Sequence, residues 1–216
     1  MTSAVAEFRC DGDPLDDLWL AGAMGDALDR QAATVVLFDA TAESLVRPAF
    51  SAAALRSLVL FELPVVFALE GALFGAMTEF ALACDVRVCG RGASLRGRLR
   101  ANARIRTLTD EATALSLYLG QVAIDAPGLL ARGLVSVVSE PGEALVEARR
   151  TAAVIASRGP IATRFGKEAI WRGLVQPLEQ ALRFKTDLTL LLQTTKDRDE
   201  GVRAFLEKRT PVFKGE

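Results

Sequence analysis

The stretch that decides the fold is Leu63–Cys89, with the sequence LPVVFALEGALFGAMTEFALACDVRVC. Its first part, Val65–Leu69, is an apolar run typical of a buried strand. Ala76–Cys84 then has the composition of a helix, and Val86–Cys89 is a second apolar run. A strand, a helix and a strand joined by short connections predict a parallel sheet with right-handed crossovers. Ligands of such sheets bind at the carboxyl ends of strands, beside helix N-termini.

The same alternation of strands and helices extends in both directions. Upstream, we expect strands over Val5–Arg9 and Ala33–Asp39 and helices that begin after Asp13 and Ser51. Downstream of Thr109, helices dominate. We expect helices over residues 109–119, 125–132, 142–157 and 198–209. Two further helices should have Pro160 and Pro177 as their first residues, and one strand should cover residues 134–138. We therefore predict an α/β core over residues 1–140 and a helical C-terminal region over residues 141–216.

The composition excludes several classes of function. The 216 residues are half apolar and one quarter charged, which is typical of a folded domain. Lys and Arg number 26 against 27 Asp and Glu, a balance that argues against a general nucleic-acid binder. Histidine is absent from the sequence, which excludes Ser–His–Asp and Cys–His triads and histidine-ligated metals. We expect no metal site.

The cysteines and the apolar segments predict a compartment. Cys10, Cys84 and Cys89 do not form an even disulfide framework, so we expect a reducing environment. The first residues lack the basic start and apolar run of a signal peptide. The most apolar stretch, Leu58–Leu69, is too short to cross a bilayer. We therefore expect a cytoplasmic protein with no membrane partner.

Glu79 is the candidate catalytic residue, because it lies one helical turn after Ala76. At the start of this helix, the N–H groups around Gly75, Ala76 and Met77 lack intrahelical acceptors and can stabilise an oxyanion. Helix side chains lean toward the N-terminus, so the Glu79 carboxylate can reach the space before these groups. One carboxylate beside one oxyanion site suits proton transfer next to a carbonyl. The alternative is a solvated Glu79 on a helix surface.

The decisive stretch resembles the signature of the enoyl-CoA hydratase/isomerase (crotonase) superfamily. The matching positions are Pro64-Val65, Gly71, Gly75, Glu79, Ala81 and Cys84-Asp85. The segment Ala126–Val138 and the tail Arg198–Lys214 are also similar to the family. The resemblance implies a crotonase-like ββα superhelical core with a helical C-terminal trimerisation region, assembled as a homotrimer or hexamer. It also implies an acyl thioester of coenzyme A or an acyl carrier protein as substrate, with no further cofactor.

The chain departs from the family's pattern at both oxyanion donors. Gly75-Ala76-Met77 stands where members commonly have three glycines, but the backbone donors of Ala76 and Gly75 survive that change. In the other oxyanion loop the chain has Arg47-Pro48-Ala49. Proline has no N–H, so Ala49 or Arg47 has to supply that donor.

The chain also departs from the family at its acidic residues. Leu99 stands where hydratases have a second glutamate, and Glu70 stands where many members have asparagine. We expect Leu99, Met77 and Phe74 to line the substrate pocket. Asp110 or Glu111 either approaches the pocket from the next helix or is a first-turn acid that complements the helix dipole.

An arginine run lies between Asp85 and Asp110, with no acidic residue inside it. Its members are Arg87, Arg91, Arg96, Arg98, Arg100, Arg104 and Arg106. The run is either a solvated basic face or a site for the phosphates of coenzyme A, an acidic carrier protein or RNA. We assign Arg96 and Arg98, with Lys214 of the tail, to the phosphate of coenzyme A or the carrier. The lack of interleaved aromatic residues disfavours RNA.

Two functions therefore stand ahead of RNA binding. In the first, the protein is an isomerase or lyase in which Glu79 moves a proton of an acyl thioester and the Ala76 N–H stabilises the enolate. Double-bond isomerisation, dehydration and hydration all belong to this class, but hydration ordinarily uses two carboxylates to hold one water. In the second, the protein is a catalytically impaired family member that binds a thioester or supports a partner enzyme.

Overall fold

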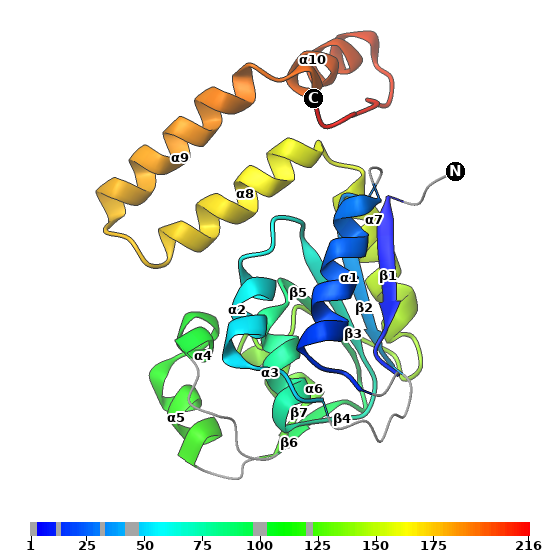
Figure 1. The fold of residues 1–216 in the computed structure, drawn as a ribbon, viewed down its shortest axis with the longest axis vertical. Helices are drawn as coiled ribbons and strands as arrows, with labels where there is room; N and C mark the ends of the chain where they lie inside the picture. Colours follow the sequence, from blue (N-terminus) through cyan, green and yellow to red (C-terminus); the bar gives the residue numbers. More distant parts are fainter. Residues whose placement is uncertain (1–3, 12–13, 31–32, 42–47, 97–102, 120–122) are drawn as a thin grey trace. The chain divides into compact units, whose positions relative to one another are not determined.

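The computed structural model describes residues 4–11, 14–30, 33–41, 48–96, 103–119 and 123–216. The chain divides into two compact units (Figure 1). The first unit comprises residues 1–61 and 65–153, and the second comprises residues 62–64 and 154–216. The first unit thus extends past residue 140, where the sequence analysis placed a boundary. None of the helices in the described ranges is long and apolar enough to span a membrane.

The first unit is built on a five-stranded sheet in the order β1-β2-β3-β5-β8, and all neighbouring pairs are parallel. The strands are β1 (Val5–Arg9), β2 (Val35–Ala40), β3 (Val65–Leu69), β5 (Val86–Gly90) and β8 (Val137–Ser139). Every residue of β3 is buried, as its unbroken apolar run predicts. The expectation of a parallel sheet is confirmed.

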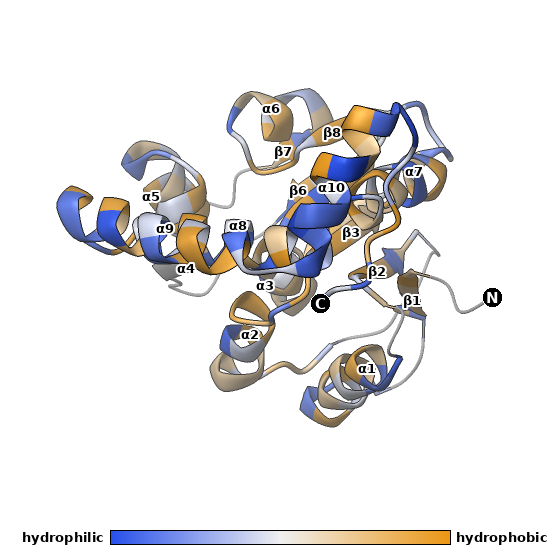
Figure 2. Cartoon of the chain, turned by 90° about the horizontal axis from the view of Figure 1, so that it is seen from above, coloured by the Kyte–Doolittle hydropathy of each residue, from blue (hydrophilic) through white to orange (hydrophobic). Residues whose placement is uncertain are grey.

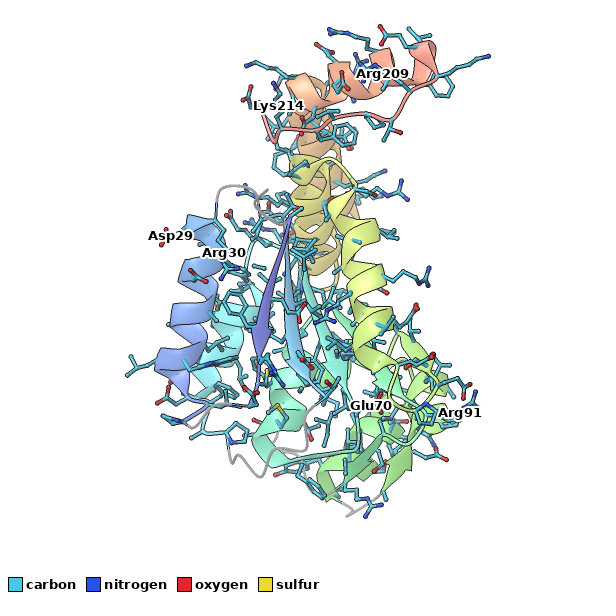
Figure 3. All side chains as sticks on the ribbon, turned by 90° about the vertical axis from the view of Figure 1, so that its right-hand side faces the viewer. Asp29, Arg30, Glu70, Arg91, Arg209 and Lys214 are labelled. Carbon is cyan, nitrogen blue, oxygen red and sulfur yellow. The ribbon has the colours of Figure 1, made fainter. Side chains whose placement is uncertain are left out.

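Helices on both sides of this sheet complete the layers. They are α1 (Asp17–Asp29), α2 (Ala52–Val59), α3 (Gly75–Ala83) and α7 (Ala144–Ala156). In Figures 1 and 3, α1 lies on one side of the sheet and α7 on the other. The Ser51 hydroxyl accepts from the Ala54 N–H at 3.1 Å, which confirms the expected start of α2. Asp16 caps α1 instead, by accepting from the Trp19 N–H at 2.9 Å, and Asp13 lies outside the described residues.

A second, smaller sheet lies beside α3 and was missed by the sequence analysis. It joins β4 (Ala72–Phe74), β6 (Ser94–Arg96) and β7 (Ile124–Asp125). β4 and β6 are parallel, and β6 and β7 are antiparallel. Three short helices belong to the same part of the chain: α4 (Ala103–Leu108), α5 (Glu111–Leu119) and α6 (Ala126–Ala131). Strands of two or three residues are too short to show the alternation that identifies a strand in a sequence.

An aromatic cluster anchors α3 to the large sheet. Phe80 of α3 lies edge-on to Phe38 of β2, with ring centroids 5.0 Å apart, and stacks on Phe50 at 4.9 Å. Phe67 of β3 and Trp19 of α1 contact the same ring at 5.7 and 6.3 Å. Each aromatic pair contributes roughly 0.5–1.5 kcal/mol beyond the area it buries. The cluster therefore fixes which face of α3 points into the core.

The second unit contains α8 (Pro160–Gly173), α9 (Leu178–Gln193) and α10 (Lys196–Glu207). Pro160 opens α8 as predicted, whereas Pro177 is the residue before α9. The Asp197 carboxylate is buried and accepts from the backbone N–H groups of Lys214 and Gly215 at 2.7 and 2.9 Å. This contact holds the tail against the start of α10.

The helices of the second unit expose many apolar side chains. These are Ile170, Leu174, Val175, Leu178, Leu182, Leu190, Leu191, Val202, Phe205 and Leu206. Figure 2 shows hydrophobic residues among hydrophilic ones along α9 and α10. Large exposed apolar surfaces on soluble proteins mark interaction sites.

Asp85, which precedes β5, is hydrogen-bonded to the first residue of the neighbouring strand β3. Its Oδ2 accepts from the Val65 N–H at 2.8 Å, and its own N–H donates to the Val65 carbonyl at 2.9 Å. Asp85→Ala leaves the N–H of the buried Val65 without this acceptor. We therefore expect the free energy of unfolding to fall by about 1–3 kcal/mol, measured by urea denaturation.

Asp29→Ala, at an exposed position in the last turn of α1, is the matched control. It removes a carboxylate that no described residue contacts. Its effect should stay within about 0.5 kcal/mol. Equal stability of Asp85→Ala and the wild type would contradict a structural role for Asp85.

Candidate active site

The candidate site is built around the N-terminus of α3. Phe74, the residue before the helix, has an extended backbone with φ −134° and ψ 145°, and it provides no side-chain cap. Gly75 has φ +49°, a left-handed conformation that a side chain would disfavour. The N–H groups of a first helical turn have no intrahelical acceptor. The backbone donors predicted at Gly75 and Ala76 therefore lie at a helix end that the N-cap residue, Phe74, does not cap.

Glu79 lies one turn further along the same helix and is buried, with 4% of its surface exposed. The alternative of a solvated surface carboxylate is therefore wrong. Helical geometry places Glu79 on the same side as Gly75 and Ala76, at spacings of four and three residues. Ala76 and Met77 are half-buried. The arrangement is a carboxylate sheltered from bulk water on the face of α3 that carries the open N–H groups.

The buried position of Glu79 follows from that of its neighbour. Phe80 points into the aromatic cluster, and adjacent residues of an α-helix are rotated by about 100°. Thr78, on the other flank of Glu79, is fully buried, and its hydroxyl has no hydrogen-bond partner among the described residues. The sequence analysis missed Thr78, because its burial depends on contacts with distant strands.

Thr78 lines a small cavity, together with Ala81 and Leu82 of α3. The cavity is walled mainly by apolar side chains of β3, α3, β5 and α6, including Phe67, Leu82, Val88 and Leu129. Its volume of about 10 Å³ is near the minimum that one water molecule requires. An acyl chain does not fit there in this conformation.

The expected second oxyanion donor, Ala49, is not available. Its N–H donates to the Leu15 carbonyl at 2.9 Å, as part of a parallel bridge between Asp16 and Ala49. An N–H that is already bonded to a backbone carbonyl cannot also polarise a thioester. Pro48 has no N–H, and Arg47 lies outside the described residues. The prediction of Ala49 as a donor is therefore corrected for this conformation.

The predicted pocket and phosphate residues are described only in part. Phe74 and Arg96 are in-register neighbours on β4 and β6, both exposed, and Phe74 is 58% exposed. The Arg96 Nε donates to the Ser94 hydroxyl at 3.2 Å. Leu99 and Arg98 lie outside the described residues. Lys214 belongs to the second unit, so its expected role beside Arg96 stays a prediction.

The described members of the arginine run do not form one basic face. Arg87 is buried, and its Nε and Nη1 donate to the carbonyls of Leu134 and Cys84, both at 2.6 Å. Burial lowers the pKa of the Arg87 guanidinium. Arg91 forms an ion pair with Glu140 at 2.7 Å. Arg87 and Arg91 thus have structural roles, which the number of arginines in the sequence does not reveal.

Asp110 is a helix cap, as one of the two sequence interpretations proposed. Its carboxylate accepts from the Thr113 N–H at 2.9 Å and from the Thr113 hydroxyl at 2.7 Å. These hydrogen bonds lower the pKa of Asp110. They fix the carboxylate at the start of α5, and Glu111 is exposed on the same helix.

The three cysteines are buried, and none forms a disulfide. Burial, followed by the charges of Asp39 and Asp11, raises the pKa of Cys10. Burial and then the charge of Glu70 raise the pKa of Cys89 to about 11. A thiolate is the nucleophilic form of cysteine, so neither group suits nucleophilic catalysis near neutral pH.

Comparisons with known proteins assign the chain to a family. Residues 42–216 match the family model described as enoyl-CoA hydratase/isomerase. The chain is 35% identical over 162 residues to (E)-benzylidenesuccinyl-CoA hydratase of Thauera aromatica, covering 70% of this chain and 63% of that protein. It is 32% identical over 162 residues to the probable mitochondrial enoyl-CoA hydratase 2 of Arabidopsis thaliana, covering 71% and 54%. The chain thus spans little more than half the length of these relatives.

Solved structures share the fold over nearly the whole chain. An enoyl-CoA hydratase from Bacillus anthracis superposes with a TM-score of 0.86 at 26% identity, covering 99% of this chain and 96% of that one. An enoyl-CoA hydratase from Mycobacterium tuberculosis H37Rv has a TM-score of 0.87 at 22% identity, covering 100% and 97%, and supports the fold alone. The resemblance seen in the sequence is confirmed: the chain has the crotonase fold and belongs to the enoyl-CoA hydratase/isomerase family.

Proposed function

We propose that the protein binds an acyl thioester at the N-terminus of α3 and moves a proton beside its carbonyl. The observation that carries this proposal is the buried Glu79, one turn after the open N–H groups of Gly75 and Ala76. The Ala76 N–H donates to the thioester oxygen, and Glu79 is the general base and acid. The first relatives act, by their names, on CoA thioesters, so we propose a CoA thioester before a carrier-protein thioester.

The chemistry requires no cofactor. Glu79 removes a proton from the carbon next to the thioester carbonyl, and the electron pair of the broken C–H bond moves toward the thioester oxygen. The Ala76 N–H and the positive end of the α3 dipole stabilise the resulting enolate. Returning the proton to the γ-carbon shifts a double bond, and expelling a β-hydroxyl as water completes a dehydration. A positioned acid or base contributes typically 10²–10⁴-fold to such steps.

The residues present favour isomerisation over hydration and over dehydration, which is the reverse of hydration. Hydration by two carboxylates needs a second acid to hold the attacking water, and the sequence has Leu99 at the position of that acid. Asp110 is bonded to Thr113 at the start of α5. Proton shuttling needs only one carboxylate. Arg96 and Phe74 flank the helix end and contact the carrier part of the thioester in this proposal.

A second candidate function is a catalytically impaired family member that binds a thioester or supports a partner enzyme. The engaged Ala49 N–H favours it, because the thioester oxygen then has a donor from α3 alone. Removing one donor of an oxyanion hole costs about 10²–10³ in kcat. The two functions differ in turnover, not in thioester binding.

We also propose that the apolar side chains of the second unit are covered in a homotrimer or hexamer. Leu178 and Phe205 are 75% and 83% exposed, on α9 and α10 respectively. Within the helices α8, α9 and α10, the buried apolar residues are Leu188 and Ala204. Helices that bury few apolar side chains within their own unit gain most of their stability by packing against another chain.

Glu79→Gln tests the proposed reaction. The amide keeps the shape of the side chain but cannot accept the substrate proton, so we expect kcat to fall at least about 100-fold. Turnover is measured by mass spectrometry on 2-enoyl-, 3-enoyl- and 3-hydroxyacyl-CoA thioesters of matched chain length.

Glu111→Gln, an exposed acid at the start of α5, is the matched control and should keep wild-type turnover. Full turnover by Glu79→Gln would overturn the mechanism. A wild-type protein that binds butyryl-CoA yet turns over none of the three thioester classes would support the second candidate function instead.

The assembly is tested by light scattering after gel filtration. The wild type should have three or six times the mass of the chain, and Leu178→Asp and Phe205→Asp should shift it toward the monomer, because a buried unpaired charge is costly. Leu18→Asp replaces an equally exposed leucine of α1, at 82% exposure, and should leave the mass unchanged. A monomeric wild type at micromolar concentration would contradict the proposal.

A further inference from the structure

Glu70 occupies the end of β3, directly before the turn that leads toward α3. Its Oε1 accepts from the Gly142 N–H at 3.0 Å and from the Ala144 N–H at 3.1 Å (Figure 3). Ala144 is the first residue of α7, so the carboxylate binds the positive end of that helix. The contact joins positions more than seventy residues apart in the sequence.

Gly90 provides the space for this carboxylate. A Cβ at position 90 would lie 1.9 Å from Glu70 Oε2, and the three atoms nearest to it all belong to Glu70. Gly90 is buried at the end of β5, the strand next to β3. Gly90 does not have a positive φ, so a side chain at this position would act by displacing the Glu70 carboxylate and not by straining the backbone.

The loop that Glu70 binds is also held on its other side. The Arg91 N–H donates to the Ser139 carbonyl at 2.9 Å, and the Arg91 guanidinium pairs with Glu140 at 2.7 Å. Arg91 and Glu70 are both labelled in Figure 3. The segment from Ser139 to Ala144 is therefore fixed to the ends of β3 and β5, which makes it a firm anchor for Glu70.

The anchored turn leads directly into the candidate active site. Gly71, with φ +74°, follows Glu70, and its carbonyl accepts from the Ser94 N–H at 3.0 Å. The three residues of β4 then separate Gly71 from Gly75, where α3 begins. A shift of Glu70 therefore also moves the Ala76 N–H, because the segment between them is short and extended.

We propose that Glu70 is a positioning residue that fixes the N-terminus of α3 by tying the β3–β4 turn to the start of α7. The inference rests on the proposed function, because it concerns the placement of the Ala76 N–H and Glu79. It also assigns Glu70 a role other than that of a second acid. The Oε1 atom already accepts two backbone N–H groups, which leaves the carboxylate facing α7.

Three variants and a double variant test the proposal. Glu70→Ala removes both acceptors and should lower kcat about 10- to 100-fold, since misplacement by about 1 Å costs up to 10² in rate. The affinity for butyryl-CoA should change less than about threefold. Glu70→Gln keeps a carbonyl oxygen for the same two N–H groups and should restore most of the turnover.

Gly90→Ala should reproduce the loss seen with Glu70→Ala, because its Cβ displaces the carboxylate. In the double variant Glu70→Ala/Gly90→Ala the added methyl group meets no carboxylate, so the second substitution should have little further effect. This non-additivity is the signature of a shared contact. Glu143→Gln, at an exposed acid between the two N–H groups that Glu70 binds, is the matched control and should keep wild-type turnover.

Hydrogen exchange separates this inference from the proposed function. In Glu70→Ala, peptides covering residues 72–80 should exchange faster, together with those at the start of α7, and Glu70→Gln should resemble the wild type. Faster exchange confined to α7, or full turnover by Glu70→Ala, would overturn the inference. If no thioester is turned over by the wild type, the proposed reaction fails, while the exchange measurement still decides whether Glu70 positions α3.

Discussion

The burial of Phe80 in the aromatic cluster is the constraint on which the candidate site depends. Its ring contacts Phe38 at 5.0 Å and Phe50 at 4.9 Å, and these contacts fix the rotation of α3 about its axis. Because successive residues of a helix are turned by about 100°, this rotation also fixes where Glu79 and Ala76 point. The site is thus a consequence of core packing: the same helix supplies Phe80 to the aromatic cluster and, about 100° around its axis, the buried Glu79 carboxylate.

Two charged side chains near this helix, the buried Arg87 and the half-buried Glu70, bond to backbone groups. Arg87 donates to the carbonyls of Cys84 and Leu134, and the Cys84 carbonyl lies at the C-terminal end of α3. Glu70 accepts from the N–H groups at the start of α7. A cation at a helix C-terminus and an anion at a helix N-terminus both complement the helix dipole. Loss of the buried Arg87 guanidinium would leave two backbone carbonyls without these donors, which is costly in a buried site.

The sequence predicted the elements that have a strong local signal. The strand Val65–Leu69 is an unbroken apolar run, and the three-residue spacing from Ala76 to Glu79 defines one helix face wherever the helix lies. The small sheet of β4, β6 and β7 has no such signal, because its strands have two or three residues and depend on pairing between distant segments. The start of α1 was misplaced because several aspartates precede it and only tertiary structure selects Asp16.

The sequence predicted the site residues that lie on one helix. It did not predict correctly those that other segments supply. Glu79 and Ala76 share α3, so local geometry was sufficient to place them together. Ala49 depends on a distant loop, and its N–H is engaged by Leu15. Arg87 was counted with exposed arginines, although its strand position buries it. Because the N–H donor and the acid lie on one helix, their relative position does not depend on the conformation of a second loop. The proposed reaction accordingly uses the one N–H donor and the one carboxylate that α3 supplies.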